Sequence, residues 1–443
     1  MQRRHFLQAS GASLGSSLLA ACGGGGDATT TQDAADDNRP GTTPTTPQPS
    51  AGPVKSRVIV VGGGMAGATA AKYLRLWGDG IEVTLIERAN GYTSHIMSSL
   101  VLSGQRTLGS LAYTHDKLAT RYGVNTVFGD VVAIDPVAVK VTLASGQVLS
   151  ADRIVLAPGI AFDDVPGLGT SDRMPHAWQA GTQTTLLASQ LASMGTGGTA
   201  ILSIPKVPYR CPPGPYERAC LIADWMKVNK PRGKLIVLDA NPDFVAEKEN
   251  FSSAFYGLHA NVIEYVPNAD VTQVDPTTMR LFTTQGTFTG EVVNLIPRQK
   301  AGGLVIQQGL ANASEGRFAG VDVLSYASTV AGAGKVHIIG DSSATTQPKA
   351  GHIANQEAKV CADAISRLLS GLQPDPAPVT HSACYSTITM SQASWLTAAF
   401  QYDPASATMK VVPASSAASA GWDSGNFREM GTWFNALMAD TFA

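Results

Sequence analysis

The 443-residue sequence predicts an α/β protein with two Rossmann-like domains, the first split by the second, and a small C-terminal interface domain. Three observations carry this prediction. An apolar strand near residue 60 runs into a glycine-rich turn and a helix, and two more strand-and-turn segments follow near residues 155 and 340. A second strand–helix–strand unit lies between them, near residue 200. This order predicts one sheet assembled from two separated parts of the chain.

The composition is that of a globular protein and excludes some kinds of partner. The length allows about two or three packed domains, so a large core is possible. With 32 basic and 34 acidic residues the net charge is −2. A basic footprint for nucleic acid and an acidic tail are both excluded.

The N-terminus has the pattern of an export signal. "QRRHFLQ" pairs Arg3 and Arg4 with two apolar residues, which is the twin-arginine pattern. The weakly apolar stretch that follows, 11–21, is too short to span a bilayer. It ends in "LAAC", similar to the lipobox of bacterial lipoproteins, so we expect a lipid on Cys22. A plain signal peptide that ends near a cysteine is the alternative.

A segment rich in Gly, Thr, Pro and Asp, 23–54, follows the signal. Such a composition buries almost nothing, so we expect a disordered tether. The folded part is then expected from about Lys55, on the periplasmic side of the bacterial inner membrane. That location permits disulfides. The four cysteines besides Cys22 allow three pairings, and spacing does not choose among them. They are Cys211, Cys220, Cys361 and Cys384.

The strongest local signal is "SRVIVVGGGMAGATAAKYLRL", in which the apolar run Val58–Val61 predicts a buried parallel strand. The G-x-G-x-x-G glycines that follow are Gly62, Gly64 and Gly67. They allow a tight turn, close approach of a pyrophosphate and tight helix–strand packing. The next strand, "IEVTLIER", ends in Glu87 and Arg88, where an acid would bind ribose hydroxyls. A glycine-rich turn without a ligand is the alternative.

Two later segments indicate which dinucleotide binds. "ADRIVLAPG" is a strand that closes on a small-residue turn at Ala157, and "GKVHIIGDSS" ends in Gly340 and Asp341. Both are like segments of glutathione-reductase-like flavoproteins, where the Asp reaches the flavin's ribitol chain. Together they favour FAD. Alternatively, Asp341 only caps the helix that begins near Gly351. The dipole of that helix could stabilise anionic reduced flavin.

The central insertion lacks a second phosphate loop. It begins as a strand at Ala200–Ile204 and resumes as a helix at Tyr216–Met226, with "PYRCPPGP" between them. Prolines lack the backbone donors that a pyrophosphate needs. A further strand in "GKLIVLDANPDF" preserves the βαβ plan. NAD(P)H is therefore disfavoured as the electron donor.

Several strings carry a family resemblance from about Lys55 to the C-terminus. They are "VVGGGMAGATAAKYLRL", "PHAWQAG", "YRCPPGPYERA", "NLIP", "IGD", "ANQEAKV", "ACYS" and "WFNALMADTF". On these strings the chain resembles the flavoprotein subunit of flavocytochrome c sulfide dehydrogenase. That subunit belongs to the FAD-dependent pyridine nucleotide-disulfide oxidoreductases, and sulfide:quinone oxidoreductases are more distant relatives.

We expect six divisions of the chain, the first two from the N-terminal pattern and composition and the other four from the resemblance. They are the signal with lipobox (1–22), the tether (23–54), the first part of the FAD-binding domain (55–170), a central Rossmann-like domain with the cysteine loop (171–305), the second part of the FAD-binding domain (306–372) and a C-terminal flavin-contacting and interface domain (373–443).

The resemblance also implies a redox-active disulfide between Cys211 and Cys384 beside the flavin. Hydrosulfide would attack one sulfur, and the released thiolate would pass two electrons to the flavin. The proline loop with Arg210 and Arg218 would keep the sulfur exposed and its surroundings electropositive. A structural disulfide that clips the C-terminal segment to the core is the alternative.

Glu217 and Trp433 receive roles by the same resemblance, and Lys349 receives one from its place near the start of the last Rossmann helix, each beside an ordinary alternative. Glu217 matches a glutamate thought to handle protons, or it partners the helix dipole. Lys349 places positive charge near reduced flavin, or it is a surface lysine. Trp433 lies close to the flavin, or it packs in the core. Cys220 and Cys361 are expected to be buried thiols.

One departure from the family concerns the bond to the flavin. The family often ties its flavin to a cysteine, and Ser94 in "GYTSHIMSS" occupies that position. Because a hydroxyl cannot form that thioether, we predict FAD held without a covalent bond.

The expected function is an exported FAD-dependent sulfide dehydrogenase that passes electrons to a c-type cytochrome subunit. The chain has no C-x-x-C-H motif, so any haem belongs to a partner. The alternatives are a membrane quinone as acceptor and a non-catalytic flavin relay subunit. No metal site is expected.

Overall fold

The computed structural model describes residues 52–443. The predicted export signal with Cys22, and residues 23–51 of the predicted tether, lie outside this part. No helix within residues 52–443 is long and apolar enough to cross a membrane.

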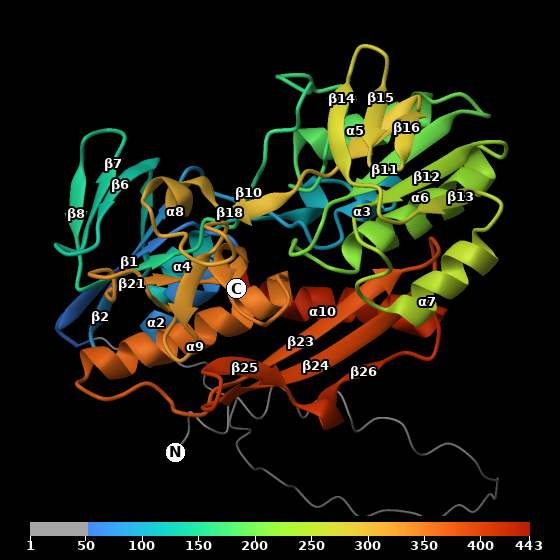
Figure 1. Ribbon diagram of the computed structural model, residues 1–443. Helices are drawn as coiled ribbons and strands as arrows, with labels where there is room; N and C mark the ends of the chain where they lie inside the picture. Colours follow the sequence, from blue (N-terminus) through green and yellow to red (C-terminus); the bar gives the residue numbers. More distant parts are fainter. Residues whose placement is uncertain (1–51) are drawn as a thin grey trace, which may run out of the picture. The chain divides into compact units, whose positions relative to one another are not determined.

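An eight-stranded sheet assembled from two separated parts of the chain forms one layer of the fold (Figure 1). In spatial order its strands are β22 (Ser343–Ala344), β19 (Ala319–Asp322), β20 (Ala327–Ser328), β21 (Val336–Ile338), β9 (Arg153–Leu156), β1 (Ser56–Val61), β2 (Ile81–Glu87) and β5 (Asn125–Phe128). The five strands from β21 to β5 are parallel. Parallel sheets are covered on both faces, which explains the apolar runs. The predicted split sheet is confirmed.

Two long helices pack together on this sheet, α2 (Met65–Trp77) and α9 (Gly351–Leu369). Alanines on α2 lie in the core and let α9 approach closely. Smaller elements complete this part of the chain. They are β3 (Tyr92–Thr93), α3 (Ser99–Leu102), η1 (Gly109–Leu111), β4 (Ala112–Tyr113), α4 (Asp116–Tyr122), β6 (Val131–Asp135), β7 (Lys140–Leu143), β8 (Val148–Ser150), α8 (Gly303–Gln307) and η3 (Gly340–Ser342).

The central insertion forms its own parallel sheet in the order β13-β12-β11-β17. Its elements are α5 (Thr182–Ser193), β11 (Thr199–Ile204), α6 (Gly214–Asn229), β12 (Lys234–Asp239), α7 (Lys248–Ser253), η2 (Ala254–Leu258), β13 (Ile263–Val266) and β17 (Val292–Leu295). An antiparallel meander adds β14 (Val271–Asp275), β15 (Arg280–Thr283) and β16 (Gly286–Thr289). The βαβ plan is confirmed, although α6 extends beyond the predicted helix at both ends. The paired strands β10 (Ile160–Phe162) and β18 (Gln299–Ala301) lie where the chain enters and leaves the insertion.

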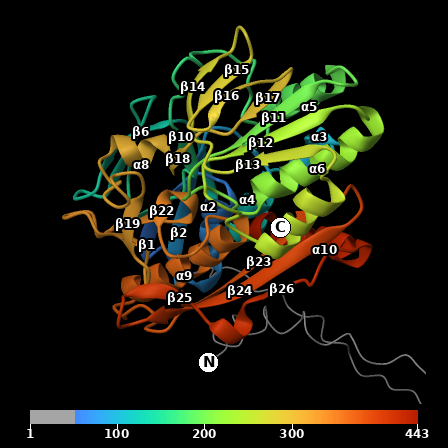
Figure 2. The same ribbon diagram turned by 45° about the vertical axis from the view of Figure 1, so that its right-hand side comes forward.

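The C-terminal segment is a third sheet followed by a helix, seen in red in Figures 1 and 2. It contains β23 (Val379–Thr387), β24 (Ala393–Asp403), β25 (Thr408–Val411), η4 (Pro413–Ser415), β26 (Ala417–Ala418) and α10 (Ser424–Phe442). Strand β23 contacts α9 and α6, so it packs against both preceding domains. The segment therefore brings its side chains to the junction of those domains.

A partly buried ionic cluster connects α10 to the helix pair. The Asp440 carboxylate lies 2.7 Å from Lys359 Nζ and accepts hydrogen bonds from the Tyr73 hydroxyl and the Asn355 amide. Burial alone would raise the pKa of Asp440, but the Lys359 charge and these hydrogen bonds hold the pKa below its usual value. The Lys72 ammonium also donates to the backbone oxygens of residues 440 and 443.

Replacing Asp440 should destabilise the fold. Asp440→Asn removes the charge and leaves the buried Lys359 ammonium without its partner, which should lower the free energy of unfolding by about 3 kcal/mol. Urea unfolding followed by circular dichroism measures the loss. The control, Asp363→Asn, breaks a helical i,i+4 pair with Arg367 and should cost less than about 0.5 kcal/mol. Equal losses for the two variants would contradict the role of the cluster.

Candidate functional site

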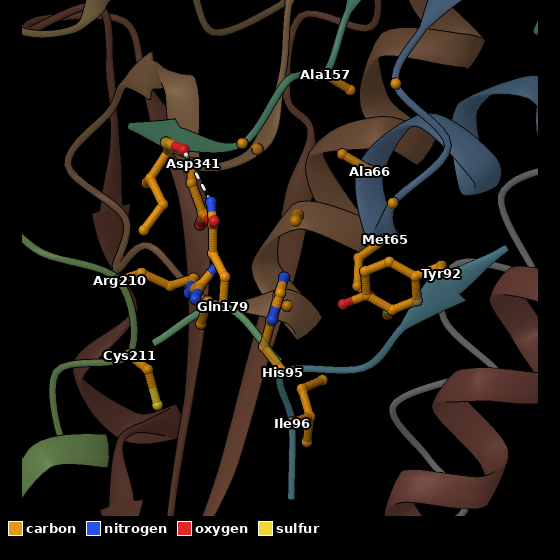
Figure 3. Close-up of a pocket in the computed structure, with 18 of the residues that line it drawn as sticks. Met65, Ala66, Tyr92, His95, Ile96, Ala157, Gln179, Arg210, Cys211 and Asp341 are labelled. Atoms are coloured by element: carbon orange, nitrogen blue, oxygen red, sulfur yellow. Dashed lines mark hydrogen bonds and ion pairs between the residues drawn. The ribbon is translucent and has the colours of Figure 1, made fainter. Parts of the chain in front are cut away.

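A cavity of about 750 Å³ lies where the three sheets meet. Its walls include the ends of β1 and β9, the proline loop before α6, strand β23 and helix α10. Figure 3 shows Arg210 and Cys211 on one side of it and Met65 and Tyr92 on the other, with His95 between them. The volume is within the range of sites that bury a large organic ligand.

The glycine turn after β1 is packed too tightly for side chains. Gly62 has φ +97°, and a Cβ placed there would lie 2.5 Å from the Ala157 carbonyl oxygen. A Cβ on Gly67 would lie 1.7 Å from the Gly62 oxygen. Gly64 lines the cavity at the start of α2, so backbone amides and the positive end of the helix dipole face the space.

The acid predicted to bind ribose lies at the cavity edge. Glu87 Oε2 accepts from the Gly63 amide at 2.5 Å, and Oε1 accepts from the Arg88 amide at 2.6 Å. Both Glu87 and Arg88 line the cavity. The carboxylate is thus tied to the glycine turn at the end of β2.

Two buried polar atoms at the other end of the cavity are left for a ligand. Asp341 Oδ1 and Trp433 Nε1 are buried and have no hydrogen-bond partner within the described residues. Asp341 Oδ2 lies 4.0 Å from Arg210 Nη1, and burial raises the pKa of Asp341. The orphaned atoms and the glycine cradle fit a dinucleotide with a polar chain, as FAD has. Gly340 and Gly351 also line this end.

Three residues predicted to bind the cofactor do not line the cavity. Gly67 packs α2 against the glycine turn. Ser94 is fully buried, and its hydroxyl donates to the Ile96 oxygen at 3.2 Å. Lys349 Nζ donates to the Ser343 oxygen at 2.6 Å and lies 3.9 Å from the Phe318 ring centroid. Their roles toward the flavin stay predictions.

The proline loop holds Cys211 in an unusual conformation. Its φ is +60°, the left-handed region that costs a non-glycine residue about 1 kcal/mol or more. The Cys211 amide donates to the Lys349 oxygen at 2.6 Å, and the Cys211 oxygen accepts from the Gly214 amide at 2.9 Å. A Cβ on Gly214 would lie 2.8 Å from Cys211 Sγ. The loop therefore fixes the direction of the thiol.

Cys384, on β23, lines the same cavity as Cys211, and both are free thiols in this structure. Burial raises the pKa of both thiols, and Cys384 is the next largest cause that raises the pKa of Cys211. Cys220 and Cys361 are fully buried thiols elsewhere. The structure thus brings together the two cysteines that the resemblance pairs.

Two buried arginines, Arg210 and Arg218, line the cysteine side of the cavity. Arg218 is 1% exposed and donates to the Ser99 hydroxyl and the Asn294 side chain, as well as to two backbone carbonyls. Its guanidinium lies 4.6 Å from the Trp178 ring centroid. Within the described residues it has no carboxylate at ion-pair distance. The pKa of Arg218, about 10, still leaves it charged at neutral pH.

Glu217 lies in the first turn of α6 and also lines the cavity. Burial raises its pKa to about 7, and a hydrogen bond from the Thr387 hydroxyl at 3.0 Å partly offsets this. A carboxyl group with this pKa takes up and releases protons near neutral pH.

The cavity also contains aromatic and polar residues that sequence reasoning did not single out. They are Tyr92, His95, Trp178, Gln179, His352 and Tyr385. His95 Nδ1 accepts from the Ala180 amide at 2.8 Å, and burial keeps its pKa well below the usual value. Several of them lie within strings that the sequence analysis names, such as "GYTSHIMSS" and "PHAWQAG". These strings were the only sequence signal that could have indicated a place in the site.

The central domain has no open nucleotide site at the corresponding place. Asp239 ends β12, where an acid would meet a ribose, but it is fully buried. It accepts from the hydroxyls of Tyr216 at 2.7 Å and Tyr265 at 2.8 Å, and twice from Asn241. Its acceptor positions are already occupied, which agrees with the expectation against NAD(P)H.

Three family models match the chain. They describe a pyridine nucleotide-disulphide oxidoreductase (residues 56–196), the central part of the sulfide dehydrogenase [flavocytochrome c] flavoprotein chain (184–297) and the flavin-binding part of flavocytochrome c sulphide dehydrogenase (376–442). The chain belongs to the flavoprotein-chain family of flavocytochrome c sulfide dehydrogenase. The predicted family is confirmed, and with it an FAD-dependent oxidoreductase.

Solved structures share the fold at low sequence identity. A sulfide:quinone oxidoreductase from Aquifex aeolicus matches with a TM-score of 0.72 at 16% identity, over 87% of this chain and 91% of that chain. An NAD-dependent persulfide reductase from A. fulgidus matches at 0.57 and 14%, over 87% and 77%. A water-forming NADH oxidase from Lactobacillus brevis matches at 0.57 and 14%, over 79% and 85%. The predicted fold class is confirmed.

Glu217 should make stability depend on pH. Its pKa is about 7 in the folded state and about 4.3 in an unfolded chain, so between these values the folded state binds more protons. The wild type should therefore lose about 3 kcal/mol of unfolding free energy through this group as pH rises from 4.5 to 8.

Glu217→Gln should remove this loss of unfolding free energy. The stability of the variant relative to wild type should therefore rise between pH 4.5 and pH 8. Urea unfolding at pH 4.5 and pH 8 measures the difference. Glu249→Gln, at an exposed position on α7, is the control and should run parallel to wild type. Parallel curves for Glu217→Gln would contradict the raised pKa.

Proposed function

We propose that the chain is an exported sulfide dehydrogenase in which Cys211 and Cys384 form the redox-active pair. One observation carries the proposal: two thiols from different domains line a cavity whose other walls fit FAD. The buried positive charges of Arg210 and Arg218 favour the binding of an anion there. Hydrosulfide is the anionic form of sulfide.

The reaction begins from a disulfide between Cys211 and Cys384. Hydrosulfide adds to one sulfur, so a new S–S bond forms, the bond between the cysteines breaks and the other cysteine leaves as a thiolate. The persulfide proton then passes to the ionised carboxylate of Glu217, which its pKa of about 7 allows. The cysteine–cysteine bond forms again as the substrate sulfur leaves and two electrons depart.

The residues around the cavity would hold FAD in place. The glycine turn and the start of α2 would bind the pyrophosphate, Glu87 the ribose hydroxyls, and Asp341 the ribitol chain. FAD, when bound, supplies the acceptor for the two electrons. Ser94 supports binding without a covalent bond, because its hydroxyl is turned to the backbone.

A c-type cytochrome subunit is the proposed acceptor, and the family's name supports it. A quinone as acceptor remains the second candidate, favoured by the fold shared with the sulfide:quinone oxidoreductase of Aquifex aeolicus. Export by the twin-arginine route and a lipid on Cys22 would place the complex on the periplasmic face of the membrane. These two steps rest on the sequence pattern alone.

Sulfide should bleach the flavin of the wild-type protein. Under anaerobic conditions, stopped-flow absorbance near 450 nm should show rapid loss of the oxidised band, whereas NADH should leave it unchanged. Cys384→Ser should slow the bleaching by at least about 1000-fold, because no disulfide is left to attack.

The matched control is Cys220→Ser, whose thiol is buried away from the cavity and should not affect the rate. Unchanged absorbance in the wild type, with a normal flavin spectrum, would reject sulfide as substrate. Equal bleaching rates for the two serine variants would show that the disulfide is structural and takes no part in sulfide oxidation.

Acid should release the flavin from the protein. Without a covalent bond, trichloroacetic acid should unfold the chain and leave all the FAD in the supernatant, as measured by fluorescence. Ser94→Cys, which restores the thiol that the family uses, is the comparison. Yellow pelleted protein from the wild type would contradict non-covalent binding.

A further inference from the structure

Glu247 is a half-buried acid that the proposed reaction does not use. It follows β12 and directly precedes α7. Its φ of +44° lies in the left-handed region, which is strained for a residue other than glycine. Its neighbours Lys248 and Glu249 are exposed. Glu247 alone of the three turns toward the C-terminal sheet.

The carboxylate of Glu247 bridges two strands. Its Oε1 accepts from the Ser386 hydroxyl at 2.6 Å and its Oε2 from the Ser394 hydroxyl at 2.5 Å. The two serines are paired directly across β23 and β24 and are fully buried. Each carboxylate oxygen thus has a donor. Burial raises the pKa of Glu247, and these hydrogen bonds to the charged form partly offset the rise.

This bridge lies next to the second thiol of the pair. Cys384 is two residues before Ser386 on β23, so their side chains are on the same face of the strand. After burial, the negative charge of Glu247 is the next largest cause that raises the pKa of the Cys384 thiol, ahead of Glu217. Within the described residues no lysine or arginine lies at ion-pair distance from Glu247, so the charge is not neutralised.

We propose that Glu247 is a positioning residue of the thiol site, whose carboxylate keeps Cys384 in the neutral thiol form whenever the pair is reduced. The inference deepens the proposed function and rests on it, since that reaction breaks the bond between Cys211 and Cys384. When hydrosulfide attacks Cys211, Cys384 leaves with the electron pair of the broken bond and takes up one proton from water, which it gives up again when the cysteine–cysteine bond re-forms. A neutral thiol is a poor nucleophile, so reduced Cys384 is protected from side reactions.

The other charged groups around Glu247 do not cancel this effect. Helix α6 contributes Glu217, the buried Cys220 thiol and the Asp224–Lys227 pair at 3.5 Å. Glu217 feels the charge of Glu247, which raises its pKa. Strand β24 contributes the Ser394 hydroxyl, and α7 contributes Asn250, which hydrogen bonds Glu247. Both acids near Cys384 therefore act in the same direction.

The test measures the thiol directly and needs no sulfide. In the full-length holoprotein with Cys211→Ser, iodoacetamide alkylation of Cys384 is followed by peptide mass spectrometry between pH 6 and pH 10. Glu247→Gln should lower the thiol pKa by a unit or more, and the alkylation rate at pH 8 should rise by at least about tenfold. The matched control, Glu249→Gln, removes an exposed charge from the same helix and should change the rate less than about twofold.

A second pair of variants separates charge from packing. Glu247→Asp and Glu247→Asn have nearly the same shape, and both residues tolerate the left-handed backbone. The Asn variant should alkylate about tenfold faster than the Asp variant, even if Glu247→Gln does not fold. Equal rates for Asp and Asn, or for Glu247→Gln and Glu249→Gln, would overturn the proposal. Such a result would not contradict sulfide oxidation by this protein. Conversely, an absence of flavin bleaching by sulfide would contradict the proposed function but would not change the measured pKa of the Cys384 thiol.

Discussion

The hydrogen bond from the Cys211 amide to the Lys349 oxygen, at 2.6 Å, joins the two Rossmann-like domains at the site. One partner lies in the proline loop before α6, and the other lies just before α9, whose first turn faces the cavity. Cys211 makes this bond in the left-handed conformation, with φ +60°, and it lines the cavity. The same residue thus connects the proline loop to the FAD-binding part of the chain and contributes a thiol to the site.

The two thiols share a cavity and both are affected by the charge of Glu217, but Arg210 acts on Cys211 alone and Glu247 on Cys384. Burial, Cys384 and Glu217 raise the pKa of Cys211 and Arg210 partly offsets them, whereas only acids act on Cys384 from nearby charged side chains. Burial is the larger effect at both thiols. The difference comes from the central domain, because the loop before α6 carries Arg210 next to Cys211, whereas Glu247 contacts Ser386 and Ser394 near Cys384. A symmetrical disulfide therefore sits in an asymmetrical field.

Much of the fold follows from local sequence. The apolar run before the glycines, and the acid that ends the next strand, specify β1, α2 and β2 without knowledge of the rest. The absence of a phosphate loop from the insertion was also predicted from local sequence, because proline lacks a backbone N–H donor in any conformation. The meanders and the ends of α6 were not predicted, since short alternating strands have weak patterns and helix ends depend on packing.

The site was less accessible to sequence reasoning, and the reason is physical. Cys211 and Cys384 are far apart in the chain, and only the family strings paired them. Glu247 gives no local signal at all, because in "VAEKENF" it is one of three consecutive charged residues. What distinguishes it is its contact with Ser386 and Ser394, which lie about 140 residues later in the chain. A buried charge is specified by the tertiary surroundings that desolvate it, so such residues are found only once the strands are in place.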